Sequence, residues 1–201
     1  MNLNIKDFKL RTEQKYEPRP VVRGYSMRSL HVDVGSGKFT EKTVSEDMKK
    51  RFTGGKGFGL KLLWDATKPT TKWDSPENEI VIAMGPVCGN TNYPGSGKSL
   101  VCSLSPMTGI PIDSNVGGYF GPYLKFSGFD ALEVQGKSDK ETIVFIDGNE
   151  GVLRVYEAPA AGLEYDTHLL AEQLTHAFAK DEKSLQAVSV VSAGRGADHS
   201  P

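Results

Sequence analysis

The chain has 201 residues and a formal net charge of −1, with 22 glycines and 11 prolines. The length suits one large domain or two small ones, and the glycine and proline content favours many turns and strands over long helices. The small net charge argues against a nucleic-acid-binding surface over the whole chain, and no apolar run approaches the roughly 20 residues that a membrane span needs.

The first 24 residues are polar and mildly basic, with six lysines and arginines. We expect residues 1–24 to be an arm that is disordered or lies on a partner, and residues 25–201 to be the folded domain. The segment has no apolar signal core, which predicts a cytoplasmic protein. Cys88 and Cys102 are the only cysteines. They are too few for a disulfide framework or for the usual four thiolates of an iron–sulfur cluster.

The first predicted element is a hairpin. Apolar and polar residues alternate with a period of two over residues 26–34, which predicts a strand. A turn at 35–37 leads into a return strand at 38–44. A short helix capped by Ser45 follows, and a second short helix is predicted to emerge from the Gly-rich segment 53–59.

Most of the remaining predicted elements are strands, at 79–86, 99–106, 131–136, 142–147, 152–158 and 185–194. A short helix is expected within residues 114–128. The clearest helix runs over residues 166–180, where apolar residues fall on one face at helical spacing. The order shows no regular βαβ alternation, so we predict an α+β fold with antiparallel or mixed sheets.

Three Gly-rich turns are the densest chemical feature. They comprise Gly54, Gly55, Lys56 and Gly57; then Gly95, Gly97 and Lys98; then Ser114, Asn115, Gly117 and Gly118, at the start of a possible helix. Glycine lets the backbone approach a ligand closely, N–H groups at turns and helix starts bind anions, and lysine suits phosphate. Each turn alone is better explained as an ordinary turn, but three in one chain predict a polyanionic ligand.

The string YPGSGKS at 93–99 imitates a phosphate-binding P-loop, which requires a helix after the lysine. The following residues, 100–106, have the pattern of a strand, and Asn92 stands where the first glycine belongs. A nucleotide-binding module that uses this loop is therefore an alternative that the pattern disfavours.

The other polar residues give weak signals. Cys88 and Cys102 are interpreted as buried structural cysteines, and Asp113 and Asp130 as turn or capping residues. Four histidines lie far apart along the chain and are interpreted as structural or solvated: His31, His168, His176 and His199. No catalytic residue is predicted.

Five segments carry a family resemblance: RSLHVDVGSGKFT, TGGKGFGLKLLWD, SPENEIVIAMGPVCG, GSGKSLVCSLSPMTG and DSNVGGYFGPYLKFSGFDALEVQGK. In order and spacing, over roughly residues 28–194, they resemble the N-terminal domain of the aldehyde:ferredoxin oxidoreductase family. The stretch 105–137 is the most specific. The resemblance implies two β-sheets that form a base for a tungsten or molybdenum ion held by two pyranopterins, with Mg²⁺ joining the pterin phosphates.

The resemblance also implies roles for single residues. Lys98 stands where the family has a basic residue, often Arg, between pterin and iron–sulfur cluster, and Lys56 matches another basic position near the cofactor. Asn115 stands where a backbone carbonyl binds the bridging Mg²⁺, an oxygen ligand that suits this ion. Gly117 and Gly118 lie in the turn that approaches the pterin phosphate, and Gly97 belongs to the loop of Lys98.

Members of this family oxidise aldehydes to carboxylic acids with ferredoxin as acceptor, and a related branch serves benzoyl-CoA reduction. The [4Fe-4S] cluster ligands and a second Gly-rich pterin loop, expected just after residue 194, are not found in this sequence. We therefore expect a fragment, or one polypeptide of a split enzyme, whose partners are the remaining domains or a catalytic subunit and a ferredoxin-like electron carrier. A pure interaction scaffold that binds no cofactor remains the other alternative.

Overall fold

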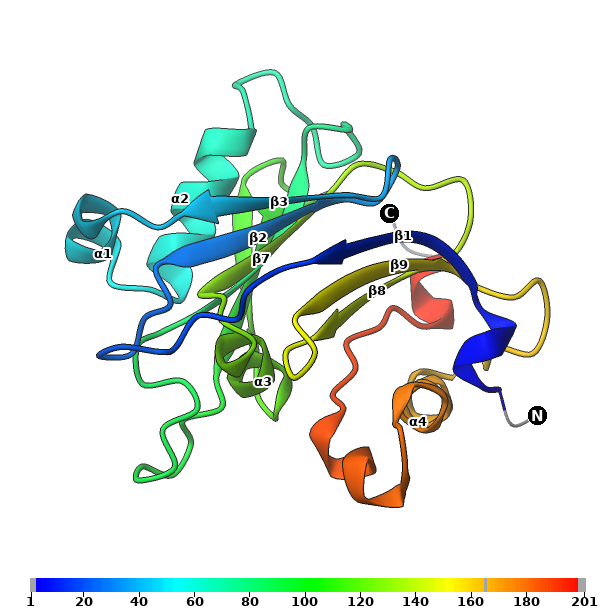
Figure 1. Cartoon of the computed structure of the whole chain (residues 1–201). Helices are drawn as coiled ribbons and strands as arrows, with labels where there is room; N and C mark the ends of the chain where they lie inside the picture. The colour runs from blue at the N-terminus through cyan, green and yellow to red at the C-terminus, as the bar shows by residue number, and fades with distance from the viewer. Residues whose placement is uncertain (1–2, 165, 199–201) are drawn as a thin grey trace.

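The computed structural model of the chain describes residues 3–164 and 166–198. Figure 1 shows two β-sheets packed face to face, with the helix at residues 56–66 on the outer face of the larger sheet and the helix at residues 167–178 on the outer face of the smaller. The strands are β1 (Lys9–Lys15), β2 (Arg28–Asp33), β3 (Lys38–Thr43), β4 (Glu79–Met84), β5 (Ser99–Leu104), β6 (Pro111–Val116), β7 (Ala131–Gln135), β8 (Thr142–Asp147) and β9 (Val152–Glu157). The α-helices are α1 (Glu46–Phe52), α2 (Lys56–Ala66), α3 (Phe120–Phe126) and α4 (Thr167–Phe178).

The larger sheet has six strands in the order β3-β2-β7-β4-β5-β6, and the smaller has three in the order β1-β9-β8. The β2–β7 pair is parallel, and the other neighbouring pairs are antiparallel. The predicted α+β fold with antiparallel or mixed sheets and a few short helices is therefore confirmed. Among the described helices, none is long and apolar enough to cross a membrane.

Two apolar cores lie on the two faces of the six-stranded sheet. Leu30 and Val32 of β2 pack with Leu153 and Val155 of β9 between the sheets, and all four are fully buried. On the other face, α2 packs its Phe58, Leu62 and Leu63 against β4 and β5. Complete burial of such a side chain stabilises the fold by roughly 1.5–3 kcal/mol.

The predicted helices form where their caps are found. The Ser45 side chain accepts a hydrogen bond of 3.0 Å from Met48 N at the start of α1, and Asp166 caps α4 in the same way. α2 begins at Lys56, several residues earlier than the apolar pattern indicated, because Gly57 can enter the helix. A Cβ at Gly57 would lie 2.1 Å from the carbonyl oxygen of Phe52, so glycine is needed where α2 meets α1.

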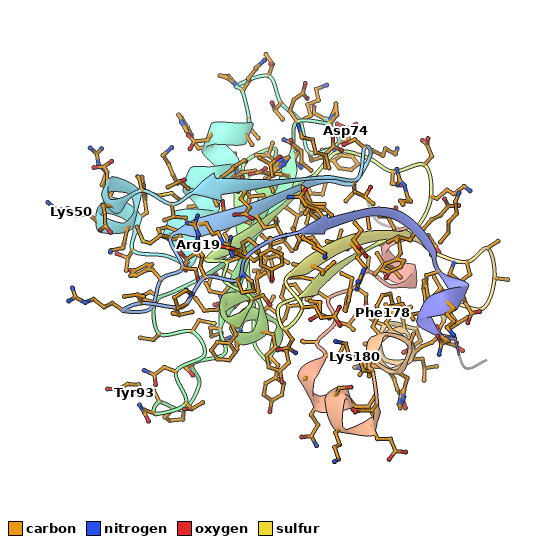
Figure 2. All side chains as sticks on the ribbon, viewed as in Figure 1. Arg19, Lys50, Asp74, Tyr93, Phe178 and Lys180 are labelled. Carbon is orange, nitrogen blue, oxygen red and sulfur yellow. The ribbon has the colours of Figure 1, made fainter. Side chains whose placement is uncertain are left out.

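The N-terminal segment differs from the expected arm. β1 pairs antiparallel with β9, and the segment buries the side chains of Leu3, Phe8 and Tyr16. Phe8 contacts Phe178 of α4, with 5.2 Å between the ring centroids; Figure 2 labels Phe178 at this contact. The charged residues dominate the composition of this segment and so suggest a solvated arm, but they occupy the exposed side of a strand.

The predicted strand at 185–194 is also wrong. Residues Glu182–Ala187 form a 3₁₀ helix, and the following residues 188–194 belong to no sheet. Asp181 caps this helix by accepting a hydrogen bond of 2.8 Å from Ser184 N. This local polar cap, which satisfies the backbone without a neighbouring strand, favours the helix over residues 182–187.

Candidate functional site

Two of the three Gly-rich turns meet at one end of the β5–β6 hairpin. Leu100 of β5 pairs with Asn115 of β6, and the loops that enter β5 and leave β6 stay in contact beyond the last strand pair. A Cβ at Gly97 would lie 2.5 Å from the carbonyl oxygen of Gly118, so only glycine permits this backbone approach. Lys98, which joins Gly97 to β5, therefore lies beside the same turn.

The third Gly-rich turn reaches the same corner through the first turn of α2. Gly55 donates its N–H to the Met84 carbonyl over 3.0 Å, and a Cβ on Gly55 would contact the Leu100 side chain at 3.8 Å. Lys56 forms an ion pair of 2.6 Å with Asp113, which lies two residues before Asn115 on the same face of β6. The hydrogen bond to Asp113 raises the pKa of Lys56.

The structure therefore gathers every predicted site residue into one region, which we call the glycine-rich corner. It contains Gly55, Lys56, Gly97, Lys98, Asn115, Gly117 and Gly118. These residues come from three segments that lie far apart in the sequence. The sequence predicted the three segments separately but gave no reason of its own for their meeting.

One local expectation is wrong. Ser114 and Asn115 were expected at the start of a helix, but they lie in β6, and α3 begins only at Phe120. Pairing with β5 fixes them in an extended conformation. Asn115 therefore does not offer a ligand the free amide groups of a helix start. The backbone groups that it does offer depend on the position of β6 in the sheet.

β6 is an edge strand, so half of its backbone groups face away from β5. Ser105 N donates to Ile110 O over 2.9 Å at the start of the ladder. Because hydrogen-bonded and non-hydrogen-bonded pairs alternate in an antiparallel ladder, the register places Pro111, Asp113 and Asn115 in non-hydrogen-bonded pairs. Proline has no N–H to give, which agrees with this assignment. The Asn115 carbonyl oxygen therefore points outward from the free edge.

The corner also leaves open space beside its glycines. A Cβ added to Gly117 would meet no atom within 4 Å, and the same holds for Gly118, whose φ of +92° favours glycine for backbone reasons. Packing within the described part of the chain thus gives no reason for glycine at 117. Lys98 is exposed, and no carboxylate in residues 3–164 or 166–198 forms an ion pair with it.

The geometry of a P-loop is not present around Lys98. The residues after it form the strand β5, with an extended backbone from Ser99 to Leu104. A nucleotide-binding loop of this class needs a helix there, since the helix N-terminus helps to hold the phosphates. The nucleotide-binding alternative loses its structural basis.

The cysteines lie inside the protein and the loop before β5 lies outside it. Cys88 and Cys102 are buried and unpaired, and burial raises the pKa of both thiols. Among the described residues, no group of three or more His, Cys, Asp or Glu side chains could hold a metal ion. Tyr93, 64% exposed, lies on the loop that projects from the body of the molecule in Figure 2.

Sequence reasoning missed Asp113 and the strand that carries it. Asp113 was assigned to a turn or cap, whereas it forms an ion pair with Lys56 at the corner. Because Asp113, Ser114 and Asn115 are all polar and only Ile112 and Val116 beside them are apolar, the segment shows no period-two alternation that would indicate the strand. Proline and glycine on both sides of this short run concealed it.

Comparison with known proteins assigns the family. The family model described as "Aldehyde ferredoxin oxidoreductase, N-terminal domain" matches residues 29–200. A tungsten-containing aldehyde ferredoxin oxidoreductase of Pyrococcus horikoshii is 37% identical over 131 residues, which cover 65% of this chain and 21% of that protein. The WOR-like subunit of an aliphatic sulfonate oxidoreductase of Pyrococcus furiosus is 33% identical over 135 residues, with 65% and 21% covered.

A solved structure shows the same architecture. The active-site complex BamBC of benzoyl-coenzyme A reductase, in complex with 1,5-dienoyl-CoA, superimposes with a TM-score of 0.62 at 28% identity. The match covers 67% of this chain and 20% of that chain. This chain thus spans about a fifth of the length of the relatives that it matches. Because the family model covers most of its residues, the chain belongs to the aldehyde ferredoxin oxidoreductase family, as an N-terminal domain of that family.

Proposed function

We propose that this domain supplies one face of a bis-pterin tungsten or molybdenum site, and that the complete enzyme oxidises aldehydes to carboxylic acids with a ferredoxin-like acceptor. The observation that carries the proposal is the glycine-rich corner, where three separate segments place glycines, two lysines and an outward carbonyl at one exposed position. Several basic and amide groups converging in this way suit a ligand with more than one phosphate.

The residues of the corner fit such a ligand in different ways. The Asn115 carbonyl, which β5 does not use, would bind the Mg²⁺ that joins two phosphates, since this ion prefers oxygen ligands. Gly117 leaves room for a phosphate to approach the backbone. Lys98 would provide an unpaired positive charge, but as a point charge without the two-pronged geometry of arginine. Lys56, which forms an ion pair with Asp113, would add a second positive charge beside the ligand.

The cofactor, when bound, supplies the two-electron chemistry; the domain binds it, orients it and sets its electrostatic surroundings. No residue of this chain is proposed to transfer a proton or to contact substrate. The remaining parts of the enzyme would provide the iron–sulfur cluster, the substrate pocket and the opposite face of the cofactor. The partner in the proposal is therefore whichever polypeptide covers the corner.

The test is metal and pterin analysis of the chain purified together with the rest of its enzyme. We expect tungsten or molybdenum in near-stoichiometric amount, and pterin fluorescence after oxidative release. Lys98→Ala should lower the pterin content, and Lys98→Arg should retain it. Lys72→Ala, which changes an exposed lysine in the loop after α2, is the matched control. If the complex contains neither metal above background, the proposal is wrong.

A second candidate activity rests on the structural match to a benzoyl-coenzyme A reductase complex. In this alternative the same corner binds the same class of cofactor, but the complete enzyme reduces an aromatic acyl-CoA. Assays of the complex with an aldehyde and an oxidised acceptor, and with benzoyl-CoA and a reduced donor, separate the two. Turnover of benzoyl-CoA alone would replace aldehyde oxidation as the proposed activity.

A further inference from the structure

Two buried carboxylates lie next to each other on the sheet face that α2 covers, away from the glycine-rich corner. Glu79 is the first residue of β4 and Glu133 lies in β7, with exposed fractions of 1% and 0%. The register pairs Glu133 with Val81, two residues after Glu79. Since residues i and i+2 of a strand share a face, Glu79 lies diagonally across from Glu133 on the face where Val81 packs with α2.

Only one of the two carboxylates has partners. Glu133 forms an ion pair with Lys42 of β3 and accepts a hydrogen bond of 2.7 Å from Ser29 Oγ of β2. Both oxygens of Glu79 are buried without a hydrogen-bond partner in the described residues. Two carboxylates thus share a single ammonium group, and a second buried negative charge would be uncompensated.

The other charged groups near the pair do not change this balance. Asp65 of α2 adds negative charge and is already paired with Lys61. His31 of β2, directly opposite Glu133 in the register, forms a 3.0 Å hydrogen bond with Gln135. Burial, followed by the charge of Glu133, raises the pKa of Glu79 to about 8.

We propose that Glu79 is a proton-binding site built into the six-stranded sheet, which holds its proton at neutral pH and destabilises the packing of α2 on the sheet when it ionises. The reason is the cost of a buried, unpaired carboxylate, which the neutral acid avoids. The proposal concerns the stability of the domain and does not depend on the cofactor function.

The sign of the pH effect follows from proton linkage. The folded chain keeps the proton of Glu79 up to about pH 8, whereas the unfolded chain releases it near pH 4.5. Wherever the folded state binds more protons than the unfolded state, stability falls as pH rises. The stabilising contribution of the Glu79 proton to folding is therefore complete below about pH 4.5 and is lost progressively up to about pH 8.

The experiment compares the unfolding of the full 201-residue chain with that of Glu79→Gln between pH 4.5 and 9. The substitution mimics the neutral acid, so the folding equilibrium constant of the variant should rise relative to wild type by up to about tenfold per pH unit across this window. The ratio should level off above about pH 8. Glu77→Gln, an exposed neighbour, should show no such trend. A Glu79→Gln ratio that does not vary with pH overturns the proposal.

Two further measurements test the proposal, and the first of them needs no variant. The infrared carbonyl band of a neutral carboxylic acid should be present in wild type at pH 6.5 and disappear above pH 9. Glu133→Gln should lower the pH at which the loss of stability is complete. The reason is that it removes the neighbouring negative charge, which hinders ionisation of Glu79. The assignment of a proton to this position is wrong if wild type lacks the infrared band. It is also wrong if added Mg²⁺ or K⁺ restores the stability of the chain at pH 9.

Discussion

The N-terminal segment and the glycine-rich corner differ in how their side chains are used. Residues 3–16 have the composition of a solvated arm, yet Leu3, Phe8 and Tyr16 are buried and β1 completes the smaller sheet. The corner combines residues of two loops, the start of α2 and the end of β6, yet Gly117 has open space beside it. In the first region, polar composition conceals a structural role. In the second, small residues that packing does not require indicate a role outside the fold.

The largest effect is expected from deletion of residues 1–16. The deletion removes β1 and three buried side chains, each worth roughly 1.5–3 kcal/mol, from a protein whose total stability is expected to be about 5–15 kcal/mol. We expect the shortened chain to lose its cooperative thermal transition by circular dichroism. An unchanged melting temperature would restore the interpretation of this segment as an arm.

A single substitution in the same segment should have the next largest effect. Phe8→Ala removes a buried ring that contacts Phe178 and Tyr156, so the free energy of unfolding should fall by about 3–5 kcal/mol. Leu10→Ala, in β1 but 48% exposed, is the matched control and should cost less than about 1 kcal/mol. Urea denaturation of both variants measures the difference. Equal losses would mean that burial of the Phe8 ring does not anchor this segment.

The same contrast explains what the sequence could predict. The hairpin of β2 and β3 and the helix α4 follow local rules of alternation and capping, and both were predicted at nearly their observed positions. β1 was missed because its pairing with β9 joins residues more than 130 positions apart, which no local pattern shows. The predicted strand at 185–194 failed at its start for a local reason, since the cap at Asp181 favours a 3₁₀ helix over residues 182–187.

The candidate site was predicted as a set of residues and not as an arrangement. The Gly-rich turns could be recognised in the sequence because closely spaced glycines usually mark turns or close backbone approaches. Their convergence is seen in the close approach of Gly97 to Gly118 and in the ion pair of Lys56 with Asp113, and in both contacts one partner lies on β6 or directly after it. Because β6 was not predicted, no local sequence pattern indicated that the carbonyl of Asn115 points outward.

Two glycines of the corner should separate stability from ligand binding. Gly97→Ala places a methyl group against the Gly118 carbonyl, so we expect a loss of about 1–3 kcal/mol from overpacking. Gly117→Ala enters open space and should change the free energy of unfolding by no more than about 0.5 kcal/mol. If the proposed function is right, both lower the pterin content of the assembled enzyme. A stable Gly117→Ala variant with full pterin content would show that the open space is not used.

The smallest effect concerns the ion pair of Lys56 with Asp113. Lys56 is 59% exposed, so solvent and salt screen the attraction, and a double-mutant cycle with Lys56→Ala and Asp113→Ala should give a coupling below about 1 kcal/mol. That coupling should fall further as salt is added. Such a weak pair does not hold the corner together, which leaves Lys56 available to an anion while Asp113 limits its motion. A coupling above about 2 kcal/mol would instead make the pair a structural element. The corner would then resemble the N-terminal segment, with its polar residues used by the fold itself.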